Sequence, residues 1–402
     1  MKPKFYRKVL KNGMTILLER RDIPVVSVCI AAKGGAIFER AKEKGISHFI
    51  EHMLYKGTKK RTSFQISQEV EKHGGVLDGF TSETMVGYWA KIPSPKLDVA
   101  LDVLSDMINN SIFDECEIEK ERKVIFEEIK MHRDSPRMHV FHKVREVLYN
   151  KPFSLPISGD EKSLKGIGRK ELVKKFKEVY VPSNMVLCVV GDADFEKLVK
   201  FAEQTFIAKS FKKKGISIKN RLGNSVEKRE GLDQANLVYA YHIPLFGDKK
   251  CYAAEVLNAL MTGGMSSRLF VEIREKRNLV YGILGILDIT KYFASTLIWA
   301  GAKPENVSKI KELIVEEFKK VVKTLSEKDL KQVKEQLVGN YLISMEDSQE
   351  QMVNLLFNEI QGEVKRFYEF EKNIRAVRLE DVRKLAKAAS EKFAFYSLVP
   401  KK

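Results

Sequence analysis

The stretch His48-Phe49-Ile50-Glu51-His52 decides how the rest of this 402-residue chain is interpreted. Two histidines four residues apart lie one above the other on a helix, so both imidazoles can reach a single metal ion. Glu51 lies beside that face, where a carboxylate can hold and deprotonate a metal-bound water. Neutral imidazoles suit zinc, and a catalytic zinc needs three protein ligands and one open position. The stretch therefore predicts a third ligand on another element; a helix with two incidental histidines is the alternative.

A helix expected at residues 114–133 offers candidates for that third ligand. Isoleucines mark its buried face, and Glu121, Glu128 and His132 fall on or beside the same stripe. Carboxylates among isoleucines are costly unless something compensates their charge, and a metal ion with a hydrogen-bonding neighbour would do so. Glu127, which should point off the stripe, and His132 are the rivals of Glu128 for ligation.

The composition describes an ordinary globular protein, with 44% hydrophobic and 31% charged residues. The net charge of +17 could attract nucleic acid, an anionic membrane surface or acidic peptides. We favour the simpler explanation, a solvated surface of lysine and glutamate of the kind common in heat-tolerant proteins. Because no stretch alternates basic residues with stacking aromatics, we expect no nucleic-acid platform.

The cysteines and the apolar runs bear on location. Cys29 and Cys188 lie in apolar, strand-like runs and are expected to be buried thiols, which suits a reducing interior. The first residues lack an apolar core of signal-peptide length, and no run approaches the ~18 apolar residues of a membrane span. We therefore expect a cytoplasmic protein that does not bind membranes.

The order of expected elements indicates two similar halves. The first half has expected elements at 8–34 (two strands), 45–56 (helix), 63–73 (helix), 76–92 (extended), 97–109 (helix), 114–133 (helix), 139–149 (helix) and 170–191 (helix, then strand). The second half has them at 237–241 (strand), 252–260 (helix), up to 276 (helix), 281–300 (strands), 306–325 (helix) and 395–399 (strand). Strands mixed with helix pairs favour an α+β fold, with antiparallel-rich sheets packed against helices.

A lysine-rich, poorly periodic segment separates these halves. We expect a first domain at 1–208 that carries the metal site, a linker at 209–230, and a second, similar domain at 231–402.

The motif H-x-x-E-H is the inverted form of the zinc-protease signature H-E-x-x-H. The chain resembles the pitrilysin and mitochondrial-processing-peptidase family over nearly its whole length. In that family a glutamate ligand follows about 76 positions later, in an E-x6-E helix; here His52 plus 76 is Glu128, and Glu121 stands seven residues before it. Further matching residues are Tyr180-Val181-Pro182-Ser183-Asn184-Met185 and Gly191. The resemblance implies one zinc ion per chain on His48, His52 and Glu128, with Glu51 as general base and Glu121 orienting the ligands.

The second half carries the family's other expected features. Gly263-Gly264 opens a glycine-rich turn, and Arg274 and Tyr281 follow seven residues apart. Without the resemblance, the two glycines could suggest a phosphate cradle, but no lysine of the Walker pattern accompanies them. The resemblance implies that Arg274 and Tyr281 contact the substrate and stabilise the developing oxyanion.

One segment departs from the family pattern. An edge strand that pairs with the substrate usually contains Asn-Ala-x-Thr-x-x-Glu, whereas this chain has Asp78-Gly79-Phe80-Thr81-Ser82-Glu83. Asp78 replaces an amide that can donate a hydrogen bond, and the glutamate is displaced by one position. We still expect Asp78, Gly79, Phe80 and Thr81 to bind the substrate backbone by strand addition.

Taken as a whole, the resemblance implies a zinc metalloendopeptidase that hydrolyses unfolded peptides or processing segments. The family builds a closed chamber from four repeated domains, and two such domains here imply a homodimer. Three other functions stay open. They are a non-catalytic structural or partner subunit of a larger assembly, a nucleic-acid-binding protein, and a peptidase that needs a sister chain.

Overall fold

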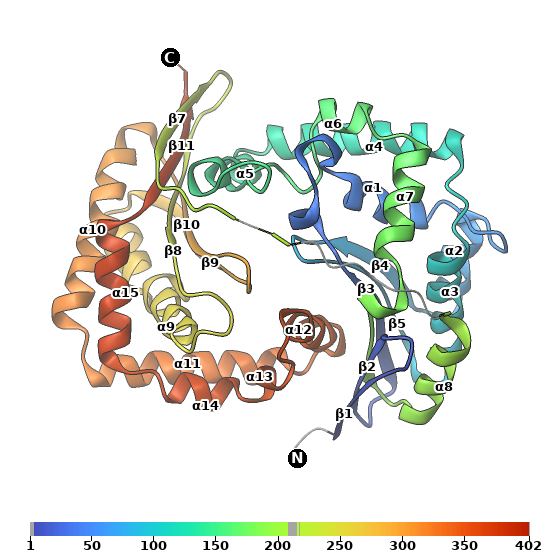
Figure 1. The fold of residues 1–402 in the computed structure, drawn as a ribbon. Helices are drawn as coiled ribbons and strands as arrows, with labels where there is room; N and C mark the ends of the chain where they lie inside the picture. Colours follow the sequence, from blue (N-terminus) through green and yellow to red (C-terminus); the bar gives the residue numbers. More distant parts are fainter. Residues whose placement is uncertain (1–3, 208–214, 217, 402) are drawn as a thin grey trace. The chain divides into compact units, whose positions relative to one another are not determined.

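The computed structural model describes residues 4–207, 215–216 and 218–401, which divide into two compact units (Figure 1). Unit 1 comprises residues 1–129, 156–216 and 344–367, and unit 2 comprises residues 130–155, 217–343 and 368–402. Each unit contains one β-sheet and its own hydrophobic core. The two halves expected from the sequence are therefore present, but each unit takes a segment from the other half of the chain.

The two sheets have the same strand order. The first contains β1 (Lys4–Val9), β2 (Thr15–Arg20), β3 (Val25–Lys33), β4 (Val76–Thr81), β5 (Met85–Pro93) and β6 (Met185–Gly191), in the order β1-β2-β6-β3-β5-β4. The second contains β7 (Asn224–Arg229), β8 (Ala235–His242), β9 (Val280–Ile289), β10 (Ala294–Ala302) and β11 (Ala394–Pro400), in the order β7-β11-β8-β10-β9. If β1 is left out, each sheet has five strands. From one edge to the other, these are the first, last, second, fourth and third strands in chain order. The duplication expected from element order is thus a repeated topology.

The strand pairing repeats as well. Each sheet has one parallel pair, β2 with β6 and β7 with β11, and the remaining pairs are antiparallel. This confirms the expected α+β fold with antiparallel-rich sheets. β4 and β9 occupy equivalent edges of their sheets, each paired on one side only.

The helices fall close to their expected positions. The α-helices are α1 (Ile46–Leu54), α2 (Ser63–Glu71), α3 (Leu97–Asn110), α4 (Glu115–Asp134), α5 (Pro136–Leu148), α6 (Glu161–Lys165), α7 (Arg169–Val179), α8 (Phe195–Thr205), α9 (Cys251–Thr262), α10 (Val307–Thr324), α11 (Glu327–Ser344), α12 (Ser348–Gln361), α13 (Lys365–Tyr368), α14 (Phe370–Arg375) and α15 (Leu379–Glu391). The 3-10 turns are η1 (Ala36–Phe38), η2 (Ala41–Glu43), η3 (Ser94–Lys96), η4 (Pro182–Asn184) and η6 (Pro304–Asn306). The helix expected up to Lys276 is a π-helix, η5 (Phe270–Glu275).

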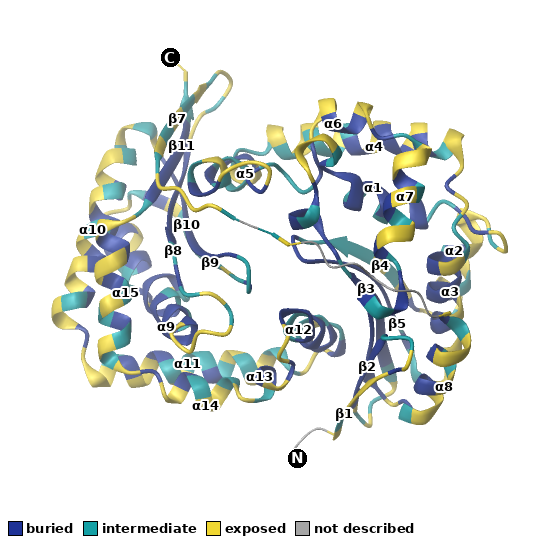
Figure 2. Ribbon diagram, in the orientation of Figure 1, coloured by how far each residue is buried: buried dark blue, intermediate teal, exposed yellow. Residues whose placement is uncertain are grey.

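Each sheet buries both faces. In β3, Val26, Val28 and Ile30 alternate onto the face that packs against α3, as a strand's two-residue period requires. Figure 2 shows most strands buried and the outward faces of the covering helices exposed. Cys29 and Cys188 lie opposite each other in β3 and β6, and both are buried thiols as expected.

The second face of each sheet is covered by a helix from the other half of the chain. α12 packs on β3 and β6 in unit 1, and α5 packs on β8 and β11 in unit 2. Polar contacts bind α12 to its sheet: Arg7 pairs with Glu359 at 2.8 Å, and the Gln351 amide donates to Glu19 at 2.7 Å. Because β3, β6 and β8, β11 are equivalent strands, the exchange is itself symmetric.

Part of the expected linker at 209–230 lies outside the described residues, at 209–214 and 217. Residues 224–229 are not a linker but strand β7, which pairs in parallel with β11. Among the described residues, no helix combines the length and the apolar composition that crossing a bilayer requires.

Candidate metal centre

The start of helix α1 is held by buried groups. Gly45 precedes the helix with φ of 93°, and a Cβ there would lie 2.5 Å from the Ser158 carbonyl oxygen, so only glycine fits. The buried Glu39 carboxylate accepts hydrogen bonds from the backbone N–H groups of Gly45 (3.0 Å) and Ser47 (2.8 Å), and Lys44 Nζ lies 3.7 Å away. A carboxylate at a helix N-terminus satisfies otherwise unpaired donors and complements the helix dipole. These contacts therefore hold the first turn of α1, which carries His48, in place.

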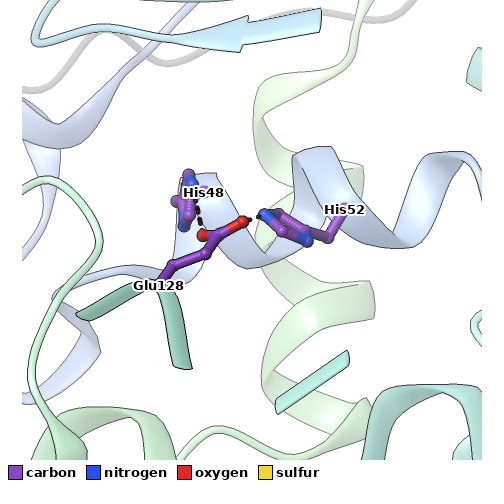
Figure 3. A group of neighbouring side chains, drawn as sticks. All are labelled: His48, His52 and Glu128. Atoms are coloured by element: carbon purple, nitrogen blue, oxygen red, sulfur yellow. Dashed lines mark ion pairs between the residues drawn. The ribbon is translucent and has the colours of Figure 1, made fainter. Parts of the chain in front are cut away.

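The structure brings His48, His52 and Glu128 together (Figure 3). One donor atom from each lies within 4.8 Å of the others, and all three residues are partly buried. Glu128 Oε2 is 3.7 Å from His48 Nε2 and 3.6 Å from His52 Nε2. Two imidazole nitrogens and one carboxylate oxygen form a donor set typical of catalytic zinc, which takes water or substrate as its fourth ligand. The residues present therefore fit a zinc ion.

A chain of contacts orients His52. Its Nδ1 donates to Glu121 Oε2 at 3.1 Å, and Lys56 Nζ contacts the other oxygen of Glu121 at 2.6 Å. Burial alone would lower the pKa of His52, but hydrogen bonds to Glu128 and Glu121 outweigh it and raise that pKa. The carboxylates that attract a proton to this ring also attract a cation to the site. Glu121 thus has the position expected of a residue that orients a ligand.

Glu51 lies on the same helix as the two histidines. The Thr81 hydroxyl on β4 donates a hydrogen bond to Glu51 Oε2. Burial raises the pKa of Glu51, and the Thr81 hydrogen bond and nearby His52 oppose the shift without cancelling it. A carboxyl with a raised pKa is better matched to accepting and returning a proton near neutral pH.

The edge strand β4 passes close to α1. A Cβ on Gly79 would lie 2.7 Å from the Tyr55 hydroxyl and 3.4 Å from Glu51 Cγ. Asp78 is exposed, and its Oδ1 accepts from the Gly79 N–H at 2.8 Å. The Phe80 ring packs over Gly87 on the opposite face of the sheet. Of the four predicted edge-strand residues, only Gly79 and Thr81 thus lie next to Glu51.

The predicted substrate pair lies in unit 2. Tyr281 on β9 is half-exposed; its ring covers Gly301, where a Cβ would come within 2.1 Å, and meets Trp299 edge-on at 5.8 Å. Arg274 on η5 is exposed, and its guanidinium lies 4.8 Å from the centre of the Phe270 ring. Each side chain is thus supported by an aromatic neighbour of its own.

The rival ligands lie elsewhere. Glu127 is exposed, and the His132 ring stacks on His142 at 5.4 Å. The sequence analysis did not identify Lys56 or Tyr55. Tyr55 follows Glu51 by four positions and Lys56 follows His52 by four positions, just past the C-terminal end of α1. That spacing places both on the functional face of the helix, so the signal was present.

The repeated fold and the donor set define a two-unit protein with a zinc-type site of the metallopeptidase kind. Comparison with known proteins agrees. The family model described as Insulinase (Peptidase family M16) matches residues 15–161. The family model described as Peptidase M16 inactive domain matches residues 166–337. The chain belongs to peptidase family M16, which confirms the resemblance seen in the sequence.

Individual relatives support the same class. An uncharacterized zinc protease of Rickettsia felis is 32% identical over 351 residues, which cover 86% of this chain and 85% of that protein. The uncharacterized zinc protease YmxG of Bacillus subtilis is 30% identical over 387 residues, covering 95% and 94%. A crystal structure of a protease from Helicobacter pylori has the same fold, with a TM-score of 0.91 at 22% identity over 99% of this chain and 100% of that one. Family membership and these relatives support a metallopeptidase.

Proposed function

We propose that this chain is a zinc-dependent endopeptidase that hydrolyses unfolded peptides or processing segments. The observation that carries the proposal is the convergence of His48 and His52 on α1 with Glu128 on α4, next to Glu51 of α1. The zinc-protease names of relatives that cover most of the chain add independent support.

His48, His52 and Glu128 would hold one zinc ion, and Glu121 would keep the His52 ring in the tautomer that leaves Nε2 free. When bound, zinc polarises the scissile carbonyl and lowers the pKa of water at the site. Glu51 accepts the proton of the attacking water and returns it to the leaving amine nitrogen. Its partly buried position limits competing exchange with bulk water.

Substrate contacts are proposed for both units. Extended peptides would add to the open edge of β4, along Asp78 to Thr81, because an unpaired strand edge offers backbone donors and acceptors. Arg274 and Tyr281 would position the substrate and stabilise the oxyanion. We further propose a homodimer with a closed chamber and a cytoplasmic location.

A non-catalytic partner subunit is the second candidate, because residues 166–337 match a family described as an inactive domain. The residues that hold the metal site all precede that segment and lie within the other match. This placement favours a chain that combines one catalytic and one non-catalytic half.

The deciding experiment measures cleavage of a mixed pool of unstructured peptides, with and without a chelator, beside Glu51→Gln. We expect chelator-sensitive cleavage that Glu51→Gln abolishes while it still retains about one zinc per chain. Zinc without cleavage would favour the non-catalytic or sister-chain alternatives, which gel filtration and added partner chains distinguish. A purified protein that holds no zinc and cuts nothing would refute the proposal.

A further inference from the structure

We infer that Thr81 is a positioning residue for Glu51 and does not bind the substrate through its side chain. Its hydroxyl donates a hydrogen bond to Oε2 of Glu51. Oε1 is then the oxygen that takes the proton from water. This inference rests on the proposed function and assigns separate tasks to the two oxygens of the base.

The direction of the side chains supports this assignment. Gly79 and Thr81 are two residues apart in β4 and therefore share one face of the sheet, the face that meets α1. Glu51 and Tyr55 are four residues apart and share one face at the end of α1. A hydroxyl on the α1 side of β4 points at the base, whereas an added peptide strand pairs with the backbone edge.

The close approach of β4 to α1 makes the contact possible. At Gly79, a Cβ would meet the Tyr55 hydroxyl at 2.7 Å, the Gly87 carbonyl oxygen at 3.3 Å and Glu51 Cγ at 3.4 Å. The Tyr55 hydroxyl is buried and has no hydrogen-bond partner among the described contacts. It fills the space that a side chain at position 79 would need. This explains why glycine stands here where the family pattern has alanine.

A misplaced base is costly, because an error of about 1 Å in a catalytic group can reduce the rate by roughly a hundredfold. Without the Thr81 hydroxyl, the Glu51 carboxylate can rotate and offer either oxygen to solvent. We therefore expect the loss to appear in kcat and not in KM, since no substrate contact is removed.

The first test compares Thr81→Val, which keeps the shape but removes the hydroxyl, with Thr81→Ser, which keeps the hydroxyl. Thr81→Val should lower kcat by about tenfold to a hundredfold, with KM within about twofold of wild type and zinc content unchanged. Thr81→Ser should retain most of the rate. Equal losses in both variants, or a raised KM with unchanged kcat, would overturn the assignment.

The second test uses the contact at Gly79. Gly79→Ala should push β4 away from α1 and lower kcat, although the hydroxyls of Thr81 and Tyr55 are both still present. With Tyr55→Phe alone as the reference, Tyr55→Phe combined with Gly79→Ala should recover much of the loss that Gly79→Ala causes, because the hydroxyl that blocks the new methyl group is gone. An additive double variant would contradict the role given to the close approach.

A third measurement does not depend on activity. Crystal structures of the metal-free wild type and Thr81→Val should show Glu51 Oε2 on the Thr81 hydroxyl in the first and a rotated carboxylate in the second. An identical Glu51 orientation in both would refute the inference even if the enzyme is active. If the wild type cuts no peptide, the proposed function fails, and these two structures still decide the role of Thr81.

Discussion

Glu227→Gln is expected to destabilise unit 2 by about 1–2 kcal/mol at neutral pH, because Glu227 joins three elements. Its Oε2 accepts hydrogen bonds from His139 Nε2 on α5 at 2.8 Å and from the Tyr396 hydroxyl on β11. Its Oε1 accepts from Arg229 on β7 at 2.9 Å. The glutamine side chain keeps the size but brings an N–H₂ group against three donors. The substitution therefore weakens the attachment of α5 to its sheet.

The magnitude follows from the pKa of Glu227. Burial alone would raise that pKa, but the hydrogen bonds from Tyr396, His139 and Arg229 outweigh it and lower the pKa from 4.5 to about 2. At about 1.36 kcal/mol per pKa unit the shift corresponds to roughly 3 kcal/mol, but Glu227 is partly exposed, and solvent screening reduces the gain from the ionised carboxylate to about 1–2 kcal/mol. Because the folded pKa is depressed, this stabilisation is complete above pH 4.5 and is lost as the pH falls toward 2.

Tryptophan fluorescence gives a local assay, since the chain contains two tryptophans, Trp89 in unit 1 and Trp299 in unit 2. In a Trp89→Phe background, urea unfolding followed at Trp299 reports on unit 2. The matched control is Glu312→Gln, which removes an exposed ion pair with Lys309 and should cost less than about 1 kcal/mol.

The pH dependence separates this network from general destabilisation. The gap in unfolding free energy between wild type and Glu227→Gln should shrink as the pH is lowered from 5 to 3. A gap that stays constant over that range, or one at neutral pH no larger than that of Glu312→Gln, would refute the reasoning.

Three further predictions concern the site. Glu128→Gln should lower zinc affinity by more than tenfold, whereas Glu127→Gln, one residue earlier and exposed, should leave it unchanged; competition with a chromogenic chelator measures both. Glu121→Gln should weaken zinc binding by about tenfold to a hundredfold through loss of the His52 contact, and Lys56→Met should have a smaller effect in the same titration. Tyr281→Phe should lower kcat/KM for peptides with no change in zinc content, which would separate its role from metal binding.

Local periodicity explains what the sequence could predict. The spacing of His48, Glu51 and His52, and of Glu121 and Glu128, specifies faces of single helices, and a helix face depends only on residues a few positions apart. The repeated element order was visible for the same reason, since each strand and helix has its own pattern.

Tertiary placement explains what the sequence could not predict. The amphipathic patterns of α5 and α12 show that each helix buries one face, but not that each covers the sheet of the other half. The contact between Thr81 and Glu51 likewise requires the close approach of β4 at Gly79. Residues 224–229 are mostly polar and charged, as in a linker, and only their pairing with β11 identifies them as a strand.

The repeated topology also gives a physical meaning to a half described as inactive. α1 and α9 both follow the second strand of their sheet's repeat and pack against the edge pair, β4 with β5 or β9 with β10. Among the described residues, only His48, His52 and Glu128 form a group that could hold a metal ion, and all three belong to unit 1. The equivalent edge strands nevertheless both carry proposed functional residues: Thr81 on β4 and Tyr281 on β9. An open sheet edge keeps backbone groups available for an extended peptide whether or not a metal lies beside it. The second unit can therefore have no metal site and still present a strand suited to the same substrate.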